Sequence, residues 1–554
     1  MESQQRGKKR KKRKSVLKNA RKYGKQGKFG RGSFLNEDTY QYFVRVLELL
    51  QSNNFETEEE KVVFVNNVFD ETIGEEVNYS CNQLASAALE KLLPFAKDVV
   101  LRRFMEAFGE NLRPICCDAY GSHIVEKLIV LASEKGKHSE EKSAENFRCW
   151  VQKVGRFILN NLEDFVWDTY ANHIIRTVTE CLGGTAARNS KMQQQPGANP
   201  TPAEYTELLS QFVHRLSAWP QFQELAHSNL TSGLLQALLY ASHSADSQLN
   251  EKLVSKLLAK CFVQDLSDNA AALRLVEAAL VTASPATWTR IYEQCFRGQL
   301  ATLAQHPMAN FSVQKLLDSC TDKQLFEGLF DELEEHVGSV LAQRHSGVLL
   351  SLAQGCRRLG TRQSRFMQML SGALQCSEAS ELVPLVARLL PCEEDGVLRV
   401  HLHGSLILQA MLHFNKPIRV VSSLLDMQPT RLQALFTDLA GCHITDAFMQ
   451  SQHVGEKSRD RMIKKLQGMY VSLACSRHGS RSLDAIWEVA NLKQKFLIMD
   501  ELSKKENILN NDKYGSILSS KYCVSLYKHR KEEWKDLQGK ETRKRKLFAD
   551  IIGK

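Results

Sequence analysis

A short pattern of polar and aliphatic residues recurs eleven times along this chain of 554 residues. Residues 118–126 read Asp-Ala-Tyr-Gly-Ser-His-Ile-Val-Glu, and residues 512–518 read Asp-Lys-Tyr-Gly-Ser-Ile-Leu. Self-similarity at a period of about 20 to 50 residues is typical of a solenoid. Aligned on its small residue, here called position one, the motif falls at Ser86, Ser122, Asn172, Ser232, Leu273, Asn310, Gly347, Ser405, Cys442, Ser480 and Ser516. The copy at Leu273 fits equally well one residue away.

The spacing of the copies separates the repeats from inserted segments. Six of the ten intervals are 36 to 38 residues long. Longer intervals contain a charged insert near 132–146 and a segment at 183–203 whose Gly, Gln and Pro content predicts a disordered loop. A further long interval contains residues 380–390, which we expect to form an extra helix.

Each repeat has the apolar spacing of helices. Ile124, Val125 and Leu128 show the i, i+3, i+4 pattern of one helix face. Gly121 and Gly515 precede such helices, where a residue without a Cβ turns the chain easily. A helix–turn–helix unit cannot bury its apolar face alone, but stacked units can. We therefore predict an all-α fold, a right-handed α-solenoid of about eleven repeats within residues 34–527.

Charge is concentrated at the two ends. Residues 1–33 carry fourteen Lys or Arg and one acid, and residues 528–554 carry ten and five, whereas the whole chain has a net charge of only +10. The body at 34–527 is therefore mildly acidic. We expect 1–33 to be a disordered basic tail and 528–554 a basic C-terminal segment. The run Lys8, Lys9, Arg10, Lys11, Lys12, Arg13, Lys14 predicts a nuclear or nucleolar address that adds phosphate affinity.

A second polar residue recurs four positions after position one. Residues i and i+4 lie one above the other on a helix, so the two side chains can face one planar edge, as when one base is read per repeat. This position five is occupied by Glu90, Glu126, Arg176, Gln236, Glu277, Gln314, Ser351, Gln409, Asp446, Asp484 and Ser520. Flat or cationic groups that can stack on a base follow position one at His123, His173, Arg274, Phe311, His443 and Arg481. A polar protein-binding groove would fit the same recurrence.

The sequence has few signs of other chemistry. Its fourteen cysteines include no CxxC pair and no Cys/His cluster with zinc spacing. There is no phosphate loop, HExxH or GxSxG motif, so we expect neither an enzyme nor a cofactor. No apolar run reaches the length of about 18 residues that a membrane span needs, and we expect no membrane partner.

The recurring motif resembles the Pumilio RNA-binding repeat. The chain as a whole resembles the nucleolar protein 9 family, above all in residues 470–487 and 303–311. The resemblance implies a C-shaped solenoid in the nucleolus that binds single-stranded or partly structured pre-rRNA alongside pre-ribosomal small-subunit proteins and restrains premature cleavage. Cytoplasmic Pumilio proteins, which repress translation, have eight nearly contiguous repeats and fit the inserts and the basic tail less well.

The resemblance also implies a base code. Asn310 with Gln314 matches the uracil pair, with Phe311 stacking. Adenine readers are implied at Ser232/Gln236 and Ser405/Gln409, and guanine readers at Ser86/Glu90 and Ser122/Glu126. Cys442/Asp446 and Ser480/Asp484 carry a shorter acid. Asn172/Arg176 departs from the common pairs, and Leu273/Glu277, Gly347/Ser351 and Ser516/Ser520 depart further, so there we expect backbone contact or none.

The alternative to RNA binding is an adaptor of the armadillo or HEAT kind that binds a protein. RNA binding requires Lys and Arg along the inner surface of the mildly acidic body, whereas an adaptor would show Asn ladders or apolar grooves. In either case we expect a monomer.

Overall fold

The computed structural model describes residues 16–27, 29–52, 55, 57–137, 142–185, 202–262, 267–389 and 399–539. The basic run at 8–14, the last part of the basic C-terminal segment from residue 540 on, and most of the insert expected at 183–203 lie outside these residues. Across the described ranges the regular structure is helical, and the one β contact is an isolated bridge between Gly32 and Asn82. The predicted all-α fold is confirmed. None of the described helices combines the length and apolarity needed to cross a bilayer.

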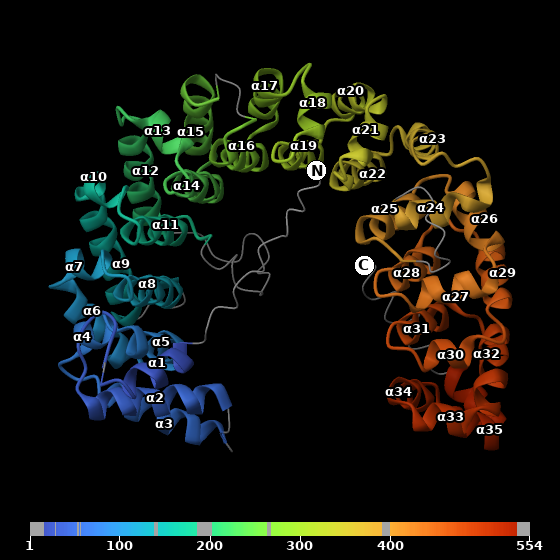
Figure 1. The fold of residues 1–554 in the computed structure, drawn as a ribbon, viewed down its shortest axis with the longest axis horizontal. Coiled ribbons are helices and arrows are strands. Elements are labelled where there is room, and N and C mark those ends of the chain that lie inside the picture. The colour runs from blue at the N-terminus through green and yellow to red at the C-terminus, as the bar shows by residue number, and fades with distance from the viewer. Residues whose placement is uncertain are drawn as a thin grey trace, which may run out of the picture. The chain divides into compact units, whose positions relative to one another are not determined.

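The helices form two compact units, residues 1–295 and 296–554 (Figure 1). The first unit contains α1 (Val16–Gly24), α2 (Glu37–Ser52), α3 (Glu58–Asp70), α4 (Glu76–Ser80), α5 (Gln83–Leu92), η1 (Leu93–Phe95), α6 (Asp98–Gly109), α7 (Leu112–Cys116), α8 (Gly121–Lys137), α9 (Lys142–Asn160), α10 (Leu162–Phe165), α11 (Ala171–Leu182), α12 (Ala203–Ser217), α13 (Phe222–His227), α14 (Ser232–Ala245), α15 (Ser247–Lys260), α16 (Ala270–Thr282) and α17 (Pro285–Cys295).

The second unit contains α18 (Leu300–Gln305), α19 (Asn310–Ser319), α20 (Lys323–Glu334), α21 (Val337–Ala342), α22 (Ser346–Leu359), α23 (Gln363–Ala373), η3 (Ala379–Glu381), α24 (Leu382–Arg388), α25 (Leu402–Leu412), α26 (Ile418–Asp426), α27 (Pro429–Thr437), α28 (Cys442–Gln450), α29 (Glu456–Lys465), α30 (Tyr470–Ala474), α31 (Gly479–Val489), α32 (Leu492–Lys504), α33 (Glu506–Asn511), α34 (Lys513–Tyr522) and α35 (Val524–His529). Helix α24 lies where an extra helix was predicted at 380–390.

Every copy of the sequence motif lies at the beginning of a helix. These motif helices are α5, α8, α11, α14 and α16 in the first unit and α19, α22, α25, α28, α31 and α34 in the second. Within each unit, each motif helix packs against the next, so the motif helices run along one side with the other helices behind them (Figure 1). This is the stacked arrangement that the repeat spacing predicted.

The repeat has one more element than the predicted helix–turn–helix. In the copy at Ser122, the back helix α6 is followed by the short helix α7 and then by the motif helix α8. Leu101 and Phe104 of α6, Ile115 of α7, and Ile124 and Val125 of α8 are fully buried. Each such side chain contributes about 1.5–3 kcal/mol when removed from water. The short helix explains why the apolar pattern continues between the two longer helices.

The residue four positions before position one caps the motif helix. The Asp118 Oδ1 atom accepts hydrogen bonds from the backbone N–H groups of Tyr120 and Gly121 at 2.8 and 2.7 Å. Asp512 repeats this geometry with the amides of Tyr514 and Gly515, both at 2.8 Å. The first amides of a helix lack intrahelical acceptors, so the carboxylate satisfies them. The Asp of the motif therefore fixes the start of the helix.

The insert expected near 132–146 is largely helical. Helix α8 continues to Lys137, α9 begins at Lys142, and residues 138–141 between them lie outside the described part. Arg148 Nη1 donates to the carbonyl of Gly136 at 2.9 Å, and Ala132 is fully buried. The charged insert therefore extends α8 and α9, which pack against each other.

The disordered tail expected at 1–33 is wrong for residues 16–24, which form α1. Leu17 and Ala20 are buried, and α1 packs against α2 and α5. The Tyr40 hydroxyl donates to the carbonyl of Ala20 at 3.1 Å. The surrounding lysines and arginines dominated the composition, although two apolar residues three apart suffice to dock a short helix.

The body also continues past the expected boundary at 527. Residues 531–539 are helical, and Trp534 is fully buried. Its indole N–H donates to the carbonyl of Tyr522 at 2.8 Å, and its ring lies 4.9 Å from that of Tyr527. Trp487 stacks on Tyr522 with ring centroids 4.1 Å apart. This aromatic cluster covers the apolar end of the last repeat.

Candidate nucleic-acid interface

Positions one and five lie together on the motif helices, as the i, i+4 spacing predicted. Gln314 Nε2 donates to Asn310 Oδ1 at 3.0 Å, and Gln409 Nε2 donates to Ser405 Oγ at 2.9 Å. Arg176 Nε similarly donates to Asn172 Oδ1 at 3.0 Å. These bonds hold the longer side chain above the shorter one.

Not every pair is joined in this way. The hydroxyls of Ser480 and Ser516 donate to the backbone carbonyls of Arg477 and Lys513, both at 3.1 Å. Ser86 makes a longer bond of the same kind to Gln83 O at 3.4 Å. In these copies the position-one hydroxyl donates to a backbone carbonyl three residues earlier instead of bonding the position-five side chain.

The three recurring positions differ in exposure. Position one is covered by neighbouring repeats and is buried in every copy except the half-buried Ser480 and Ser516. Position two is exposed at His123, His173, Arg274, Phe311 and Arg481 and half-buried at His443. Phe311 is 59% exposed. Position five is half-buried at Glu126, Arg176, Gln236, Glu277, Gln314, Gln409, Asp446 and Asp484, exposed at Glu90 and Ser520, and buried at Ser351. The accessible groups are therefore chiefly those of positions two and five.

Two glycines near the start of motif helices lie against position-five side chains of the preceding repeat. A Cβ atom at Gly347, the position-one residue of the next copy, would lie 2.4 Å from Oε1 of Gln314. A Cβ atom at Gly233 would lie 2.6 Å from the guanidinium of Arg176, which donates to the carbonyl of Leu230. Glycine at 347 and 233 thus makes room for the position-five side chain of the preceding motif helix.

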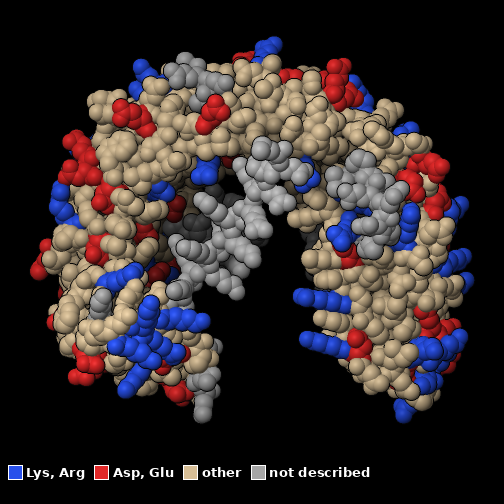
Figure 2. Space-filling view, viewed as in Figure 1, with Lys and Arg blue, Asp and Glu red and all other residues tan. Residues whose placement is uncertain are grey.

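The short acids near the C-terminus are held by cations of the following repeat. Asp446 Oδ2 lies 3.0 Å from the guanidinium of Arg481, and Asp484 Oδ1 lies 2.6 Å from Lys521 Nζ. The Tyr522 hydroxyl also donates to Asp484, at 3.1 Å. Lys and Arg side chains project from the side of the second unit where α31 and α34 lie (Figure 2). This part of the surface therefore presents cations next to the position-five acids.

In the first unit, acids occupy position five at Glu90 and Glu126. Burial, followed by the charges of Glu90 and Glu180, raises the pKa of Glu126 to about 7, while Arg176 acts in the opposite direction. Burial, with help from Arg176 and His123, lowers the pKa of His173. Near neutral pH this region holds a carboxyl group that is partly protonated and an imidazole that is mostly neutral.

Replacing Glu126 with Gln should remove a pH-dependent loss of stability. The pKa of Glu126 is higher in the folded state than in the unfolded state, so the folded chain binds the proton of this carboxyl group more tightly. The stability that the bound proton contributes is therefore lost as pH rises from about 4.5 through 7. We expect Glu126→Gln to melt near the wild-type temperature at pH 5 and to be more stable by roughly 1–3 kcal/mol at pH 8. Melting curves across this range measure the effect, and parallel curves for the two proteins would contradict it.

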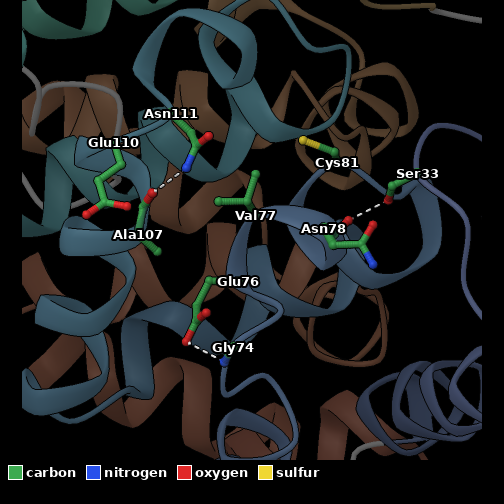
Figure 3. Close-up of a pocket in the computed structure, with 9 residues that line it drawn as sticks. All are labelled: Ser33, Gly74, Glu76, Val77, Asn78, Cys81, Ala107, Glu110 and Asn111. Carbon is green, nitrogen blue, oxygen red and sulfur yellow. Dashed lines mark hydrogen bonds between the residues drawn. The ribbon is translucent and has the colours of Figure 1, made fainter.

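A separate pocket of about 570 Å³ in the first unit is lined by residues that bond to other parts of the fold (Figure 3). Among its lining residues, Glu76 forms an ion pair with Arg103 at 2.8 Å, and Asn111 donates to the carbonyl of Ala107 at 3.1 Å. The Ser33 hydroxyl donates to the carbonyl of Asn78. Within the described ranges, no group of three or more His, Cys, Asp and Glu side chains could hold a metal ion.

Sequence reasoning missed the residues that build the recurring surface without facing a ligand. These are the caps four positions before position one, and Lys521 and Tyr522, which hold Asp484. The motif itself contained a signal for the caps, because an Asp three residues before a glycine at a helix start is typical of a capped N-terminus. The partners of Asp484 had no such signal, since they lie 37 and 38 residues away in sequence.

Stacked three-helix repeats, with polar side chains recurring on the motif helices of each unit, define the class of helical repeat proteins. Residues 74–517 match the family model of the NOP9-like PUF repeat domain. The chain is 30% identical to nucleolar protein 9 of Homo sapiens over 94% of its own length and 91% of the relative's, and 24% identical to Pumilio homolog 23 of Arabidopsis thaliana over 94% and 75%. The solved structure named APUM23-GGAAUUGACGG has the same fold, with a TM-score of 0.73 and 22% identity over 91% of this chain and 99% of that one.

The chain therefore belongs to the NOP9-like PUF repeat family. The resemblance inferred from the motif is confirmed.

Proposed function

We propose that this chain binds single-stranded or partly structured pre-rRNA along its motif helices and restrains premature processing during small-subunit maturation. Its family membership supports the proposal, as do the name of the nucleolar protein 9 relatives and the RNA sequence named with the APUM23 structure. The bases would be recognised by side chains at positions two and five, with position one supporting them.

The observation that carries this proposal is the arrangement around Gln314. Asn310 is buried and accepts from Gln314 Nε2, which leaves the carbonyl oxygen and one N–H of the amide for a partner. Phe311 exposes most of its ring beside them. An amide edge next to an exposed ring can hydrogen-bond the edge of a base and stack on its face. The arrangement matches the uracil pair of Pumilio repeats.

The other repeats would contribute unequally. Asp446 and Asp484 are short and already paired with cations, so we propose weak base selectivity there. Arg176 is bonded to Asn172 and Leu230 and is better suited to a phosphate or carbonyl oxygen than to base discrimination. Selectivity would thus come from some of the repeats, and the fold of the RNA would supply the rest.

The location and partners follow from the family and the basic tail. We propose that Lys8–Lys14, outside the described residues, directs the chain to the nucleolus, where it would act as a monomer among pre-ribosomal small-subunit proteins. A fluorescent fusion in which this run is replaced by Gln should leave the nucleolus. Unchanged nucleolar signal would assign the address elsewhere.

The binding proposal is tested with the full chain and Asn310→Ala/Gln314→Ala. Single-stranded pre-rRNA fragments and scrambled RNAs of the same composition are titrated at several salt concentrations. We expect one fragment to bind more tightly than its scrambled version, and the double variant to lose about 1–3 kcal/mol on it, roughly 5- to 150-fold in Kd. On scrambled RNA the variant should bind like the wild type.

Gln324→Ala provides the matched control. Gln324 is an exposed glutamine on the back helix α20, adjacent in the chain to α19, and should have no effect on either RNA. If the wild type binds no RNA, or binds all RNAs alike without an effect of the double variant, base reading fails. A protein-binding adaptor then becomes the better account.

A further inference from the structure

Residues 16–27 and 29–33 form a folded addition to the first repeat. Helix α1 is docked through Leu17 and Ala20, and Gly24 lies against the ring of Tyr40, where an added Cβ would approach within 3.3 Å. Because this side of α1 packs against α2 and α5, the opposite side of α1 faces outward in a fixed orientation. A tail with only an address function would need no such docking.

The outward side of α1 is basic. Lys18 and Lys22 of α1 lie four residues apart on one helix face and are exposed, and the exposed Lys25 follows in the turn that continues α1, where its N–H donates to the carbonyl of Arg21 at 3.4 Å. These three lysines are called the stripe. Arg21 is exposed beside them, but its Nε donates to Glu48 at 2.9 Å. A dense cluster of Lys and Arg side chains covers the place of α1 in Figure 2. Such a concentration of positive charge attracts a polyanion even though the body is mildly acidic.

The segment after α1 lies against the start of the motif helix α5 and places the basic residue Arg31 there. Gln83 N, at the start of α5, donates to the carbonyl of Arg31 at 2.9 Å, and Ser33 N donates to Cys81 O at 3.1 Å. Asn82 Nδ2 donates to Ser33 O at 2.8 Å, and the Ser33 hydroxyl is bonded to Asn78 (Figure 3). These bonds fix the segment across the beginning of the first motif helix.

Arg31 joins the stripe to the recurring surface. Its guanidinium lies 4.9 Å from the centre of the Tyr23 ring and donates to the Tyr23 hydroxyl at 2.6 Å. A Cβ atom at the neighbouring Gly32 would lie 2.9 Å from the ring of Tyr120, two residues before the position-one residue Ser122. The charge of Arg31 also acts on the Tyr120 hydroxyl and opposes the rise of its pKa by burial. The basic stripe and the first two motif helices are therefore continuous through Arg31.

We propose that Lys18, Lys22, Lys25 and Arg31, the basic ledge, bind the phosphates of RNA that extends beyond α5 and α8. This inference rests on the proposed function. An RNA fits the ledge better than an acidic protein segment because the ledge continues the surface that holds the bases. Its stacked Arg31–Tyr23 pair also offers a flat platform for a base. The ledge would lengthen the bound segment without adding sequence selectivity.

The test compares two triple variants of the full chain. Lys18→Gln/Lys22→Gln/Lys25→Gln removes the stripe, and Lys252→Gln/Lys256→Gln/Lys260→Gln removes the same charge from the back helix α15. Glutamine keeps the length of the side chain and avoids placing an acid near the C-terminus of α1. The probes are the RNA GGAAUUGACGG and the same RNA with ten uridines added at its 5′ or its 3′ end.

We expect the wild type to gain affinity from one of the extensions and the ledge variant to lose that gain, about tenfold. Its slope of log K against log salt should fall by about 2, since each phosphate contact with a single strand contributes about 0.7. The short RNA should bind all three proteins alike, and the α15 variant should match the wild type throughout. Lys8–Lys14 is present in every protein and cancels in the comparison.

The inference is overturned if the ledge variant keeps the wild-type affinity and salt slope on both extended RNAs, or loses equally on the short RNA. Loss of binding to polyglutamate instead, with RNA binding unchanged, would assign the ledge to an acidic protein. Failure of the proposed function looks different: the wild type then binds none of the three RNAs at low salt. Equal melting temperatures of the variants would confirm that the fold is intact.

Discussion

Replacement of Trp534 with alanine is expected to destabilise the C-terminal end of the second unit by about 3 kcal/mol or more. The side chain is fully buried and donates to the carbonyl of Tyr522 at 2.8 Å. Its removal leaves a cavity bordered by Trp487, Phe496 and Tyr527, and it exposes the end of the stack. A terminal repeat that lacks its cover loses the burial that stabilises it.

This loss should be local, because each repeat contacts only its neighbours. Native-state hydrogen exchange measures it directly: amides of α34 and α35 should exchange at least 100-fold faster, and those of α22 should be unchanged. Trp534→Phe is the control, because it keeps most of the apolar volume and loses the indole hydrogen bond, about 1 kcal/mol. Unchanged exchange in α34 for the alanine variant would show that the stack does not depend on this cover.

The parts of the fold that could be predicted from sequence are those set by recurrence. A short-range pattern repeated eleven times identifies the motif helices and their stacking, since the same local spacing must place Ile124 and Val125 against neighbours in every copy. Likewise, the position of Gln314 above Asn310 follows from helix geometry alone. Such features need only the sequence of one repeat.

The parts that could not be predicted occur once and depend on distant contacts. Helix α1 docks through Leu17 and Ala20, a pair too small to stand out among fourteen basic residues in 1–33. In the sequence Trp534 is a single tryptophan with no recurring pattern around it, and its aromatic neighbours become apparent only in the folded structure. The glycine at 347 looked like the loss of a base-reading residue, yet its local role is to make room for Gln314. Its reason lies in the preceding repeat rather than in its own.

The exposure of the three recurring positions also changes how the site is understood. Position one had been given an equal part in base reading, but neighbouring repeats bury it in most copies. It supports the longer side chain, as Asn310 does for Gln314. Under the proposed function, the accessible position-five side chains would select a base and the exposed position-two side chains would stack on it. Changes at position five should therefore alter selectivity, whereas changes at position one should mainly alter its strength.

The central claim is that the side chains at positions two and five of the motif helices recognise bases. It is tested most directly by changing which base one repeat prefers. Asn310→Ser/Gln314→Glu turns the uracil pair into the guanine pair that the family resemblance implies. A carboxylate can accept from both donors on the Watson–Crick edge of guanine, whereas the glutamine amide has only one acceptor oxygen and would place its own donor against the other. Each good base contact is worth about 1–3 kcal/mol, so the preference should swing by roughly 10-fold or more in favour of guanine.

The measurement uses the full chain, its double variant and a set of RNAs derived from the best-bound fragment, in which each nucleotide is changed in turn to the other three. The account predicts that wild type and variant agree at every nucleotide but one, where the wild type prefers uracil and the variant guanine. If the two proteins have the same preferences at every nucleotide, or the variant is only weaker throughout, these side chains do not recognise bases.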